Sequence, residues 1–286
     1  MSRHTSIRIG GPADYYLEPV DLDDFLKLMK YLEEQRYPAV IIGRGTNLLV
    51  SDEGIRGAVI NLEKTLSRIA AENETVIAEA GAGLAALVDF CLKRGLSGLE
   101  KLAGIPGTVG GAVIMNAGAW GDEISDHITE LEIFRSGSVV KIFKEHAGFG
   151  YRRSGFEDDI VLKATFKLTP GDATMLEEIR RELLTKRGKN QPLNSPNFGC
   201  TFRNPADSSA AKLLQEAGLK GAKRGDAQIS EKHANFIVNL GSASAADVIG
   251  LIAVAKTTVQ KKFGINLVPE VKLYGFAENI LKDIPG

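Results

Sequence analysis

The sequence GIPGTVGGAVIMNAGAWG occupies residues 104–121 and contains six glycines and no charged side chain. Glycine loses more backbone freedom on ordering than any other residue, so a long regular helix or strand is not expected here. Glycines also let a backbone approach a ligand closely and let neighbouring N–H groups converge on an anion. Pro106 suits the first position of a short helical turn whose N–H groups would face a phosphate. Composition alone leaves two interpretations open, a pyrophosphate-binding loop and a buried glycine-rich turn against a sheet.

A second glycine loop lies upstream. Residues 39–42 predict a short buried strand, which is followed by Gly43-Arg44-Gly45-Thr46-Asn47 and then by an apolar run at 48–50. This loop lacks the third glycine of the dinucleotide fingerprint, and the apolar run stands where that fingerprint needs a helix. A Rossmann site is therefore not expected. Two separate loops that hold one long cofactor fit better.

Composition narrows the class of protein. A chain of 286 residues is long enough for two domains, and 44% hydrophobic and 25% charged residues are ordinary for a globular protein. A net charge of −1 argues against nucleic acid as the main partner. The two cysteines, Cys91 and Cys200, exclude a disulfide scaffold and favour a reducing cytoplasm. Neither a signal peptide nor a run long enough to span a membrane is visible. We expect a cytoplasmic monomer without a metal site and without a membrane partner.

Apolar periodicity and capping residues predict the elements. Helices are expected over 21–35, 84–94, 174–187, 209–217 and 245–263, with Asp21 as one cap and Ser244 with Asp247 as another. Strands are expected over 13–19, 39–42, 58–62, 75–79, 130–134, 139–143, 160–168, 234–239 and 266–273. A turn at Ser136-Gly137 is expected to join the strands over 130–134 and 139–143, and the strict alternation of apolar residues over 160–168 indicates a half-buried strand. A loop rich in Asn, Pro and Gly is expected over 188–207. The turn at 170–172 predicts a boundary between residues 1–170, with lobes of about 1–62 and 63–170, and residues 171–286.

Four short polar motifs remain as candidate sites, and each has a structural alternative. They are Tyr151-Arg152-Arg153-Ser154, the segment 199–205 that contains Cys200, Lys232-His233-Ala234-Asn235, and Pro269-Glu270-Val271. Arg152 alone suits an ordinary surface cation, Glu270 an edge-strand charge and His233 a polar residue at the start of a strand. Cys200 follows a glycine in a turn-rich loop, an exposed setting that favours reactivity. Cys91 lies inside a predicted apolar helix, so we interpret it as a core thiol.

Taken together, these motifs resemble the UDP-N-acetylenolpyruvoylglucosamine reductase family, in the same order and spacing from His4 to Gly275. The matching segments are 9–13, 43–48, 103–111, 115–118, Tyr151-Arg152-x-Ser154, Gly199-x-x-Phe202-Arg203-Asn204-Pro205 and 269–271. The resemblance implies an α+β fold, with a two-lobed FAD-binding domain of the vanillyl-alcohol-oxidase type over 1–170. A C-terminal α/β substrate-binding domain would follow over 171–286, in the shorter subtype without a tyrosine-bearing lid loop. Family members usually carry a helix ahead of the His-Thr segment, so a shortened start is expected here.

The resemblance also implies the reaction and the residues that perform it. FAD takes a hydride from NADPH and delivers it to C3 of the enolpyruvyl ether on UDP-N-acetylglucosamine. C2 is then protonated to give UDP-N-acetylmuramate, a step of peptidoglycan precursor synthesis. Arg152 would stabilise the charge that develops on the substrate carboxylate, Glu270 would hold the enol form through a hydrogen bond, and Cys200 would protonate C2. Most members carry serine at the Cys200 position, and a thiol is the more acidic donor of the two.

Binding residues follow from the same resemblance. The expected FAD contacts are Gly43, Arg44, Gly45, Thr46, Asn47, Leu48, Gly104, Ile105, Pro106, Gly107, Thr108, Gly110, Gly111, Asn116, Ala117 and Gly118. The expected substrate contacts are Tyr151, Arg203, Asn204 and His233.

Two other functions stay open at this point. A flavin oxidase of the same fold would act on an alcohol or lactone with O₂, and the candidates for tethering its flavin are His4, Cys91, His127 and His146. A non-catalytic nucleotide-binding regulator would show no turnover. The joint presence of Arg152, Cys200 and Glu270 counts against the regulator.

Overall fold

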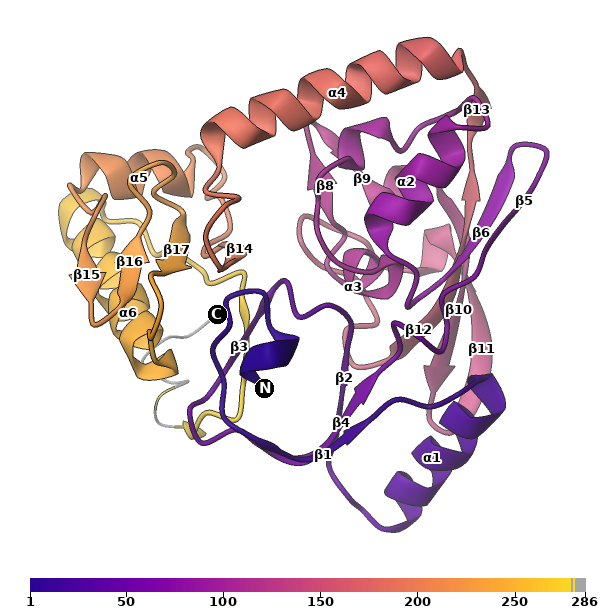
Figure 1. Cartoon of the computed structure of the whole chain (residues 1–286), viewed down its shortest axis with the longest axis horizontal. Coiled ribbons are helices and arrows are strands. Elements are labelled where there is room, and N and C mark those ends of the chain that lie inside the picture. Colours follow the sequence, from indigo (N-terminus) through magenta and orange to yellow (C-terminus); the bar gives the residue numbers. More distant parts are fainter. Residues whose placement is uncertain (279, 281–286) are drawn as a thin grey trace. The chain divides into compact units, whose positions relative to one another are not determined.

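The structure is a computed structural model that describes residues 1–278 and 280 (Figure 1). The chain forms two compact units. The first unit comprises Met1–Asp14, Gly45–Arg56 and Gly188–Gly286, and the second comprises Tyr15–Arg44 and Gly57–Arg187. The two units are defined by contacts within the chain. The predicted domains at 1–170 and 171–286 are defined by the ligand that each would bind, so they stay predictions.

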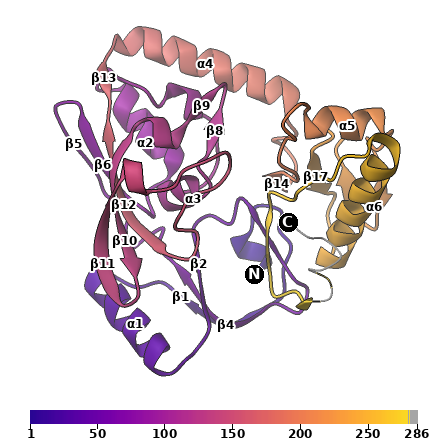
Figure 2. The ribbon, with the colours of Figure 1, turned by 180° about the vertical axis from the view of Figure 1, so that it is seen from behind.

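The second unit is built around a five-stranded antiparallel sheet. Its strand order is β11 (Ser138–Phe143), β10 (Ile128–Arg135), β12 (Ile160–Lys167), β6 (Thr75–Glu79) and β5 (Ile69–Glu72), as Figure 2 shows from behind. The predicted turn joins β10 to β11, with φ of 48° at Ser136 and 78° at Gly137. Helices α2 (Leu84–Leu92) and α3 (Val109–Ile114) bury Leu87 and Val113 in the core that this sheet also forms. Strict alternation over 160–168 therefore did mark a half-buried strand.

A second core in this unit lies under helix α1 (Leu22–Glu34). Asp21 caps the helix by accepting a hydrogen bond of 2.8 Å from the Asp24 N–H, as predicted. Phe25 is fully buried and meets the Phe134 ring edge-on at 5.9 Å. A three-stranded sheet of β1 (Ala13–Leu17), β4 (Ile55–Asn61) and β2 (Ala39–Ile42) adds apolar residues of β4 to this core. The other elements of the unit are β7 (Leu96–Ser97), η2 (Glu100–Leu102), β8 (Gly118–Ala119), β9 (Asp122–Glu123), η3 (Ile124–Asp126), η4 (Lys144–His146), β13 (Thr169–Pro170) and, up to Arg187, α4 (Ala173–Asn190).

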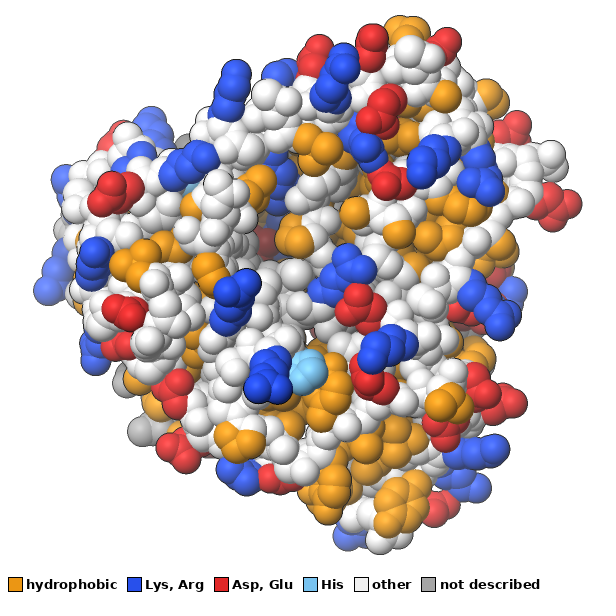
Figure 3. All heavy atoms as spheres, viewed as in Figure 1, with side chains coloured by type: hydrophobic (Ala, Val, Ile, Leu, Met, Phe, Trp, Pro, Cys, Tyr) orange, Lys and Arg blue, Asp and Glu red, His pale blue; other side chains and the backbone are white. Residues whose placement is uncertain are grey.

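The first unit contains a four-stranded antiparallel sheet. Its order is β14 (Asn197–Cys200), β17 (Phe236–Asn239), β16 (Ala227–Ile229) and β15 (Lys223–Arg224), with helices α5 (Ala210–Glu216) and α6 (Ala245–Phe263) in the same core. Ser244 and Asp247 form the predicted capping box of α6. Strands β3 (Leu48–Val50) and β18 (Lys272–Tyr274) form a separate parallel pair, and η1 (Ser2–His4) lies near the N-terminus. Acidic and basic side chains are interspersed on the face that Figure 3 displays.

Three predicted elements were wrong in their extent. The helical turn of the glycine-rich run does not begin at Pro106, because Thr108 caps α3 and the helix starts at Val109. The predicted loop at 188–207 is shorter, because α4 continues to Asn190, through Gly188 despite the low helix propensity of glycine, and β14 pairs with β17. The predicted strand at 266–273 shrinks to β18, since Pro269 lacks an N–H and makes only an isolated bridge with Phe202.

Candidate active site

The two predicted glycine loops touch each other inside the second unit. A Cβ atom on Gly43 would lie 2.4 Å from Oγ1 of Thr108, so no side chain fits there. Asn61, which is 6% exposed, donates a 3.0 Å hydrogen bond to the Gly43 carbonyl and accepts one of 2.8 Å from the Glu63 N–H. Asn61 was missed in the sequence, although a lone Asn at the end of an apolar predicted strand is a signal of buried hydrogen bonding.

Arg44 borders this junction. Its Nε donates to Glu63 at 2.8 Å, and its guanidinium lies 3.0 Å from the position that a Cβ on Gly83 would take. The Arg44 side chain is 44% exposed, so solvent screens the ion pair and the pair adds little stability. Arg44 is therefore placed as an accessible cation beside the glycine loops.

The first turn of α3 contains two neighbouring glycines with different surroundings: Gly110 is packed against the protein, and Gly111 faces open space. The N–H groups of Val109 and Gly110 donate to the carbonyls of Ala82 and Ala80, both at 2.8 Å, so our hypothesis that this turn points its N–H groups at a phosphate was wrong for these two donors. A Cβ on Gly110 would lie 2.9 Å from the Ala80 Cβ, which explains that glycine by packing. Gly111 is exposed, and a Cβ there would meet only Thr108 Oγ1 at 3.6 Å. Protein packing does not explain Gly111, and an open glycine fits the close approach of a cofactor.

Asn116 and Arg152 form one hydrogen-bonded cluster. Asn116 is 1% exposed, and its side-chain amide donates to Glu123 at 2.6 Å and to the Gly150 carbonyl at 3.1 Å. The Arg152 guanidinium donates to the carbonyls of Asn116 at 3.4 Å and Gly118 at 2.9 Å. The structure thus brings together two motifs that lie 36 residues apart, and the side chain of Asn116 is occupied by protein groups.

Glu123 contacts both members of this cluster, since it accepts a hydrogen bond from Asn116 and pairs with Arg152. Its carboxylate lies 3.7 Å from Arg152 Nη1, with 31% of the Glu123 side chain and 19% of the Arg152 side chain exposed. Arg152 also has φ of 56°, an uncommon conformation for a residue that is not glycine, and its guanidinium lies 4.9 Å from the Tyr151 ring centroid. Glu123 was missed, and its only sequence signal is a capping-box spacing with Asp126.

In the first unit, Cys200 and Glu270 lie on neighbouring segments. The Glu270 N–H donates to the Thr201 carbonyl at 2.8 Å, and Asn47 donates its side-chain amide to the Glu270 carbonyl at 3.1 Å. Three predicted motifs therefore meet at one place. Cys200 is half-buried at the end of β14, where it pairs with Phe236, so the expectation of an exposed thiol in a turn-rich loop was wrong.

Arg203 and Asn204 follow on the same segment. The Arg203 N–H donates to the Val268 carbonyl at 2.9 Å, while Asn204 accepts a 3.0 Å bond from the N–H of Ala210 at the start of α5. The Arg203 Nε is buried, and it has no hydrogen-bond partner among the described residues. Asn204 thus has a structural contact in addition to its predicted substrate role.

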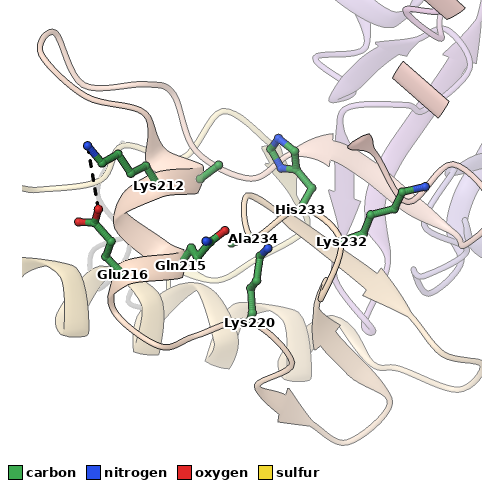
Figure 4. A pocket seen from close by; sticks show the side chains of 8 residues that line it. Lys212, Gln215, Glu216, Lys220, Lys232, His233 and Ala234 are labelled. Carbon is green, nitrogen blue, oxygen red and sulfur yellow. Dashed lines mark ion pairs between the residues drawn. The ribbon is translucent and has the colours of Figure 1, made fainter. Parts of the chain in front are cut away.

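His233 lines a pocket of about 290 Å³ between α5 and the loop before β17, together with Ala211, Lys212, Gln215, Glu216, Lys220, Lys232 and Ala234 (Figure 4). Burial, and then the charge of Lys220, lower the pKa of His233, which favours the neutral ring. Its Nδ1 is buried without a hydrogen-bond partner in the described chain. In Figure 4, Lys212 pairs with Glu216 on the outer side of α5, whereas Lys220 points toward Gln215 and Ala234. Lys220 is a pocket cation that the sequence analysis missed.

The other predicted cofactor residues lie in the same loops. Gly45 has φ of 62° and its carbonyl accepts from the Ser6 N–H at 3.0 Å, and Leu48 begins β3. Gly104 and Gly107 both have positive φ, at 79° and 123°. Ile105, Pro106 and Ala117 lie on either side of α3, and Thr46 lies between Gly45 and Asn47.

Among the proposed tether residues, Cys91 is fully buried and burial raises its pKa to about 12, which opposes thiolate formation. His127 lies 3.2 Å from the Asp122 carboxylate. In the part of the chain that the structure describes, no group of three His, Cys, Asp or Glu side chains is arranged to hold a metal ion. No helix within residues 1–278 and 280 has both the length and the apolar character needed to cross a membrane.

Comparison with known proteins gives matches over nearly the whole chain. Residues 13–142 match the FAD binding domain family, and residues 191–274 match the family described as UDP-N-acetylenolpyruvoylglucosamine reductase, C-terminal domain. A UDP-N-acetylenolpyruvoylglucosamine reductase of Chloroherpeton thalassium is 44% identical over 99% of this chain and 94% of its own length. A relative of the same name from Caldanaerobacter subterraneus is 41% identical, covering 96% of this chain and 92% of its own. The crystal structure of the reductase from Thermus caldophilus superposes with a TM-score of 0.82 at 36% identity, covering 96% of each chain.

Proposed function

This chain belongs to the UDP-N-acetylenolpyruvoylglucosamine reductase family, and from that membership we propose that it is an FAD-dependent UDP-N-acetylmuramate dehydrogenase. The substrate is the enolpyruvyl ether of UDP-N-acetylglucosamine, the reductant is NADPH, and the product is the peptidoglycan precursor UDP-N-acetylmuramate. The observation that carries the proposal is the meeting of Cys200, Glu270 and the cofactor-loop residue Asn47 within one unit.

The residues of both glycine loops fit a flavin nucleotide. Open space at Gly111, the accessible Arg44 cation and the contact between Gly43 and Thr108 support this assignment. FAD, when bound, carries the hydride from NADPH to C3 of the substrate. The chain's own residues must then position the substrate, stabilise the charge that develops on it and deliver a proton to C2.

Arg152 is proposed as the cation that stabilises the developing enolate. Hydride addition moves negative charge toward the substrate carboxylate, and a fixed cation is worth most when it is already oriented before the reaction. Two backbone carbonyls and Glu123 fix the Arg152 guanidinium in this way. Tyr151, whose ring lies beside the same guanidinium, is proposed as a substrate contact.

Cys200 is proposed as the proton donor to C2, with Glu270 as the partner of the enol oxygen. The two residues lie on paired segments, since the backbone of Glu270 is bonded to Thr201, the residue after Cys200. Half-burial of Cys200 keeps the thiol within reach while limiting its contact with solvent. A thiol transfers a proton more readily than the serine that most family members carry.

The pocket around His233 is proposed as the site for the diphosphate of the substrate. Lys220 supplies positive charge to this pocket, whereas Lys212 pairs with Glu216 and the Lys232 ammonium donates to the Gly188 carbonyl at 2.6 Å. A neutral His233 with an unpartnered buried Nδ1 is able to donate or accept one further hydrogen bond. Arg203 and Asn204, close to the start of α5, are proposed as neighbouring substrate contacts.

We also propose that residues 1–170 hold FAD, that residues 171–286 hold the substrate, and that the protein acts as a cytoplasmic monomer. The family matches at 13–142 and 191–274 support the two binding regions. Cys91 and Cys200 are thiols that are not joined in a disulfide, a state that a reducing compartment maintains.

The test is an anaerobic two-step reaction of the purified protein. NADPH should bleach the visible absorbance of the bound flavin, and the enolpyruvyl substrate should restore it at once. A flavin that stays bleached until air is admitted would support an oxidase instead. Cys200→Ser should retain substantial turnover, whereas Cys200→Ala should block reoxidation by substrate. Normal reoxidation in Cys200→Ala would remove Cys200 from the proton-donor role.

A further inference from the structure

One buried asparagine forms three hydrogen bonds to the segment that follows Cys200, two through its side chain and one through its backbone. Asn235 is 3% exposed, and its backbone carbonyl accepts from the Thr201 N–H at 2.7 Å. Its side-chain Oδ1 accepts from the Phe202 N–H at 2.9 Å, and its Nδ2 donates to the Phe202 carbonyl at 2.8 Å. The side chain of Asn235 therefore serves Phe202 as a second strand would.

This arrangement extends the sheet where the backbone of β17 can no longer do so. Cys200 still pairs with Phe236, the first residue of β17, but the chain turns just before that residue, where the Phe236 N–H donates to the His233 carbonyl. Beyond Cys200, the Asn235 backbone carbonyl binds Thr201 and its side-chain amide binds Phe202, so the contact between the two segments continues past the end of β14. On its other edge the same segment accepts from the Glu270 N–H at 2.8 Å and bridges Pro269 through Phe202.

We propose that Asn235 is a positioning residue that sets the register of Cys200 against Glu270. It acts through the Thr201–Phe202 backbone, which directly follows Cys200 in the chain and accepts the hydrogen bond from the Glu270 N–H. The inference rests on the proposed function for its catalytic consequence. The positioning itself is a property of the folded chain and is measurable without turnover.

The chain offers a matched control in Asn239. It lies at the end of β17, four residues after Asn235, and is 4% exposed. Its side chain makes three hydrogen bonds, against two for the side chain of Asn235: one to the Ile7 carbonyl at 3.0 Å, and two from the N–H groups of Gly241 and Ala243 at 2.8 and 3.1 Å. None of these partners carries a proposed catalytic group. Asn235→Ala and Asn239→Ala should therefore lower the melting temperature to a similar degree.

The distinguishing measurements are kinetics and thiol reactivity. In Asn235→Ala we expect kcat to fall by about 10- to 100-fold with little change in KM, because small misplacements of a reacting group have effects of that size. The rate of alkylation of folded protein by iodoacetamide should rise by roughly tenfold as the segment opens locally. This rate reports on Cys200, since Cys91 is fully buried with a pKa raised to about 12. In Asn239→Ala both quantities should stay within about threefold of the wild type.

Asn235→Ser provides a second variant in case Asn235→Ala does not fold. A serine has one neutral hydroxyl in place of the separate donor and acceptor of the amide, so its kcat and alkylation rate should lie between those of wild type and Asn235→Ala. Equal losses of kcat in the Asn235 and Asn239 variants would overturn the proposal, as would an unchanged alkylation rate in a folded Asn235 variant. If wild-type protein shows no turnover, the proposed function fails, and the alkylation rates still decide whether Asn235 positions Cys200.

Discussion

Replacing Gly111 by alanine tests whether this position requires glycine for the approach of a ligand or for packing within the protein. The added methyl group would meet a single protein atom, Thr108 Oγ1, at 3.6 Å, which is ordinary van der Waals contact. Gly111 lies inside α3 and is exposed, so alanine should stabilise the helix there by about 1 kcal/mol. For a protein of this size, that change should raise the melting temperature of FAD-free protein by about 2–4 °C.

FAD binding should change in the opposite direction. If the cofactor approaches the backbone at Gly111, the methyl group occupies the space that it needs. We expect the dissociation constant for FAD to rise by about tenfold or more, equivalent to about 1.4 kcal/mol. The assay is a titration of FAD-free protein that follows the quenching of flavin fluorescence, with melting curves recorded on the same preparations.

Two other glycines provide the controls. A Cβ on Gly43 would lie 2.4 Å from Thr108 Oγ1, so Gly43→Ala should destabilise even the FAD-free protein, by about 1–3 kcal/mol. A Cβ on Gly188, within α4, would meet no atom within 4 Å, so Gly188→Ala should leave FAD affinity unchanged. A Gly111→Ala protein that is stabilised and binds FAD as tightly as wild type would refute the assignment of this loop to the cofactor. A destabilised FAD-free Gly111→Ala protein would refute the packing argument itself.

Three further outcomes follow from the geometry. Arg152→Lys should lower kcat/KM by about 10²-fold or more, because a single ammonium cannot donate to the Asn116 and Gly118 carbonyls as the planar guanidinium does; steady-state kinetics with near-normal values would contradict that role. Lys220→Gln should raise the pKa of His233, measured by NMR titration of the imidazole, since one cause of its lowering is removed; an unchanged value would exclude the electrostatic contact. Folding lowers the pKa of His233, so as the pH falls below about 6.5 the imidazole is protonated more readily in the unfolded chain than in the folded one. The free energy of unfolding should therefore decrease in this acidic range. Melting temperatures recorded against pH should lose part of this acid slope in His233→Gln, and an identical slope would show that His233 does not contribute to it.

Short-range patterns were enough to predict most of the elements. The caps of α1 and α6, the turn at 136–137 and the strand at 75–79 all depend on residues within one or two turns of the chain, and each was confirmed. The ordered motifs also indicated the family, which the matches over nearly the whole chain then showed. The order and spacing of the motifs can be read from the sequence alone, without knowing which residues contact one another in the folded chain.

Only the tertiary structure decided how those motifs serve the site. Gly110 and Gly111 are neighbours in sequence, yet one packs on Ala80 and the other faces open space. Asn116 appeared as a cofactor residue, but its side chain is bonded to Glu123 and Gly150. Asn235 acts on Phe202 across 33 residues. A sequence determines which groups are able to donate, accept or carry charge, whereas burial and hydrogen-bond partners depend on which distant segments the folded chain brings into contact.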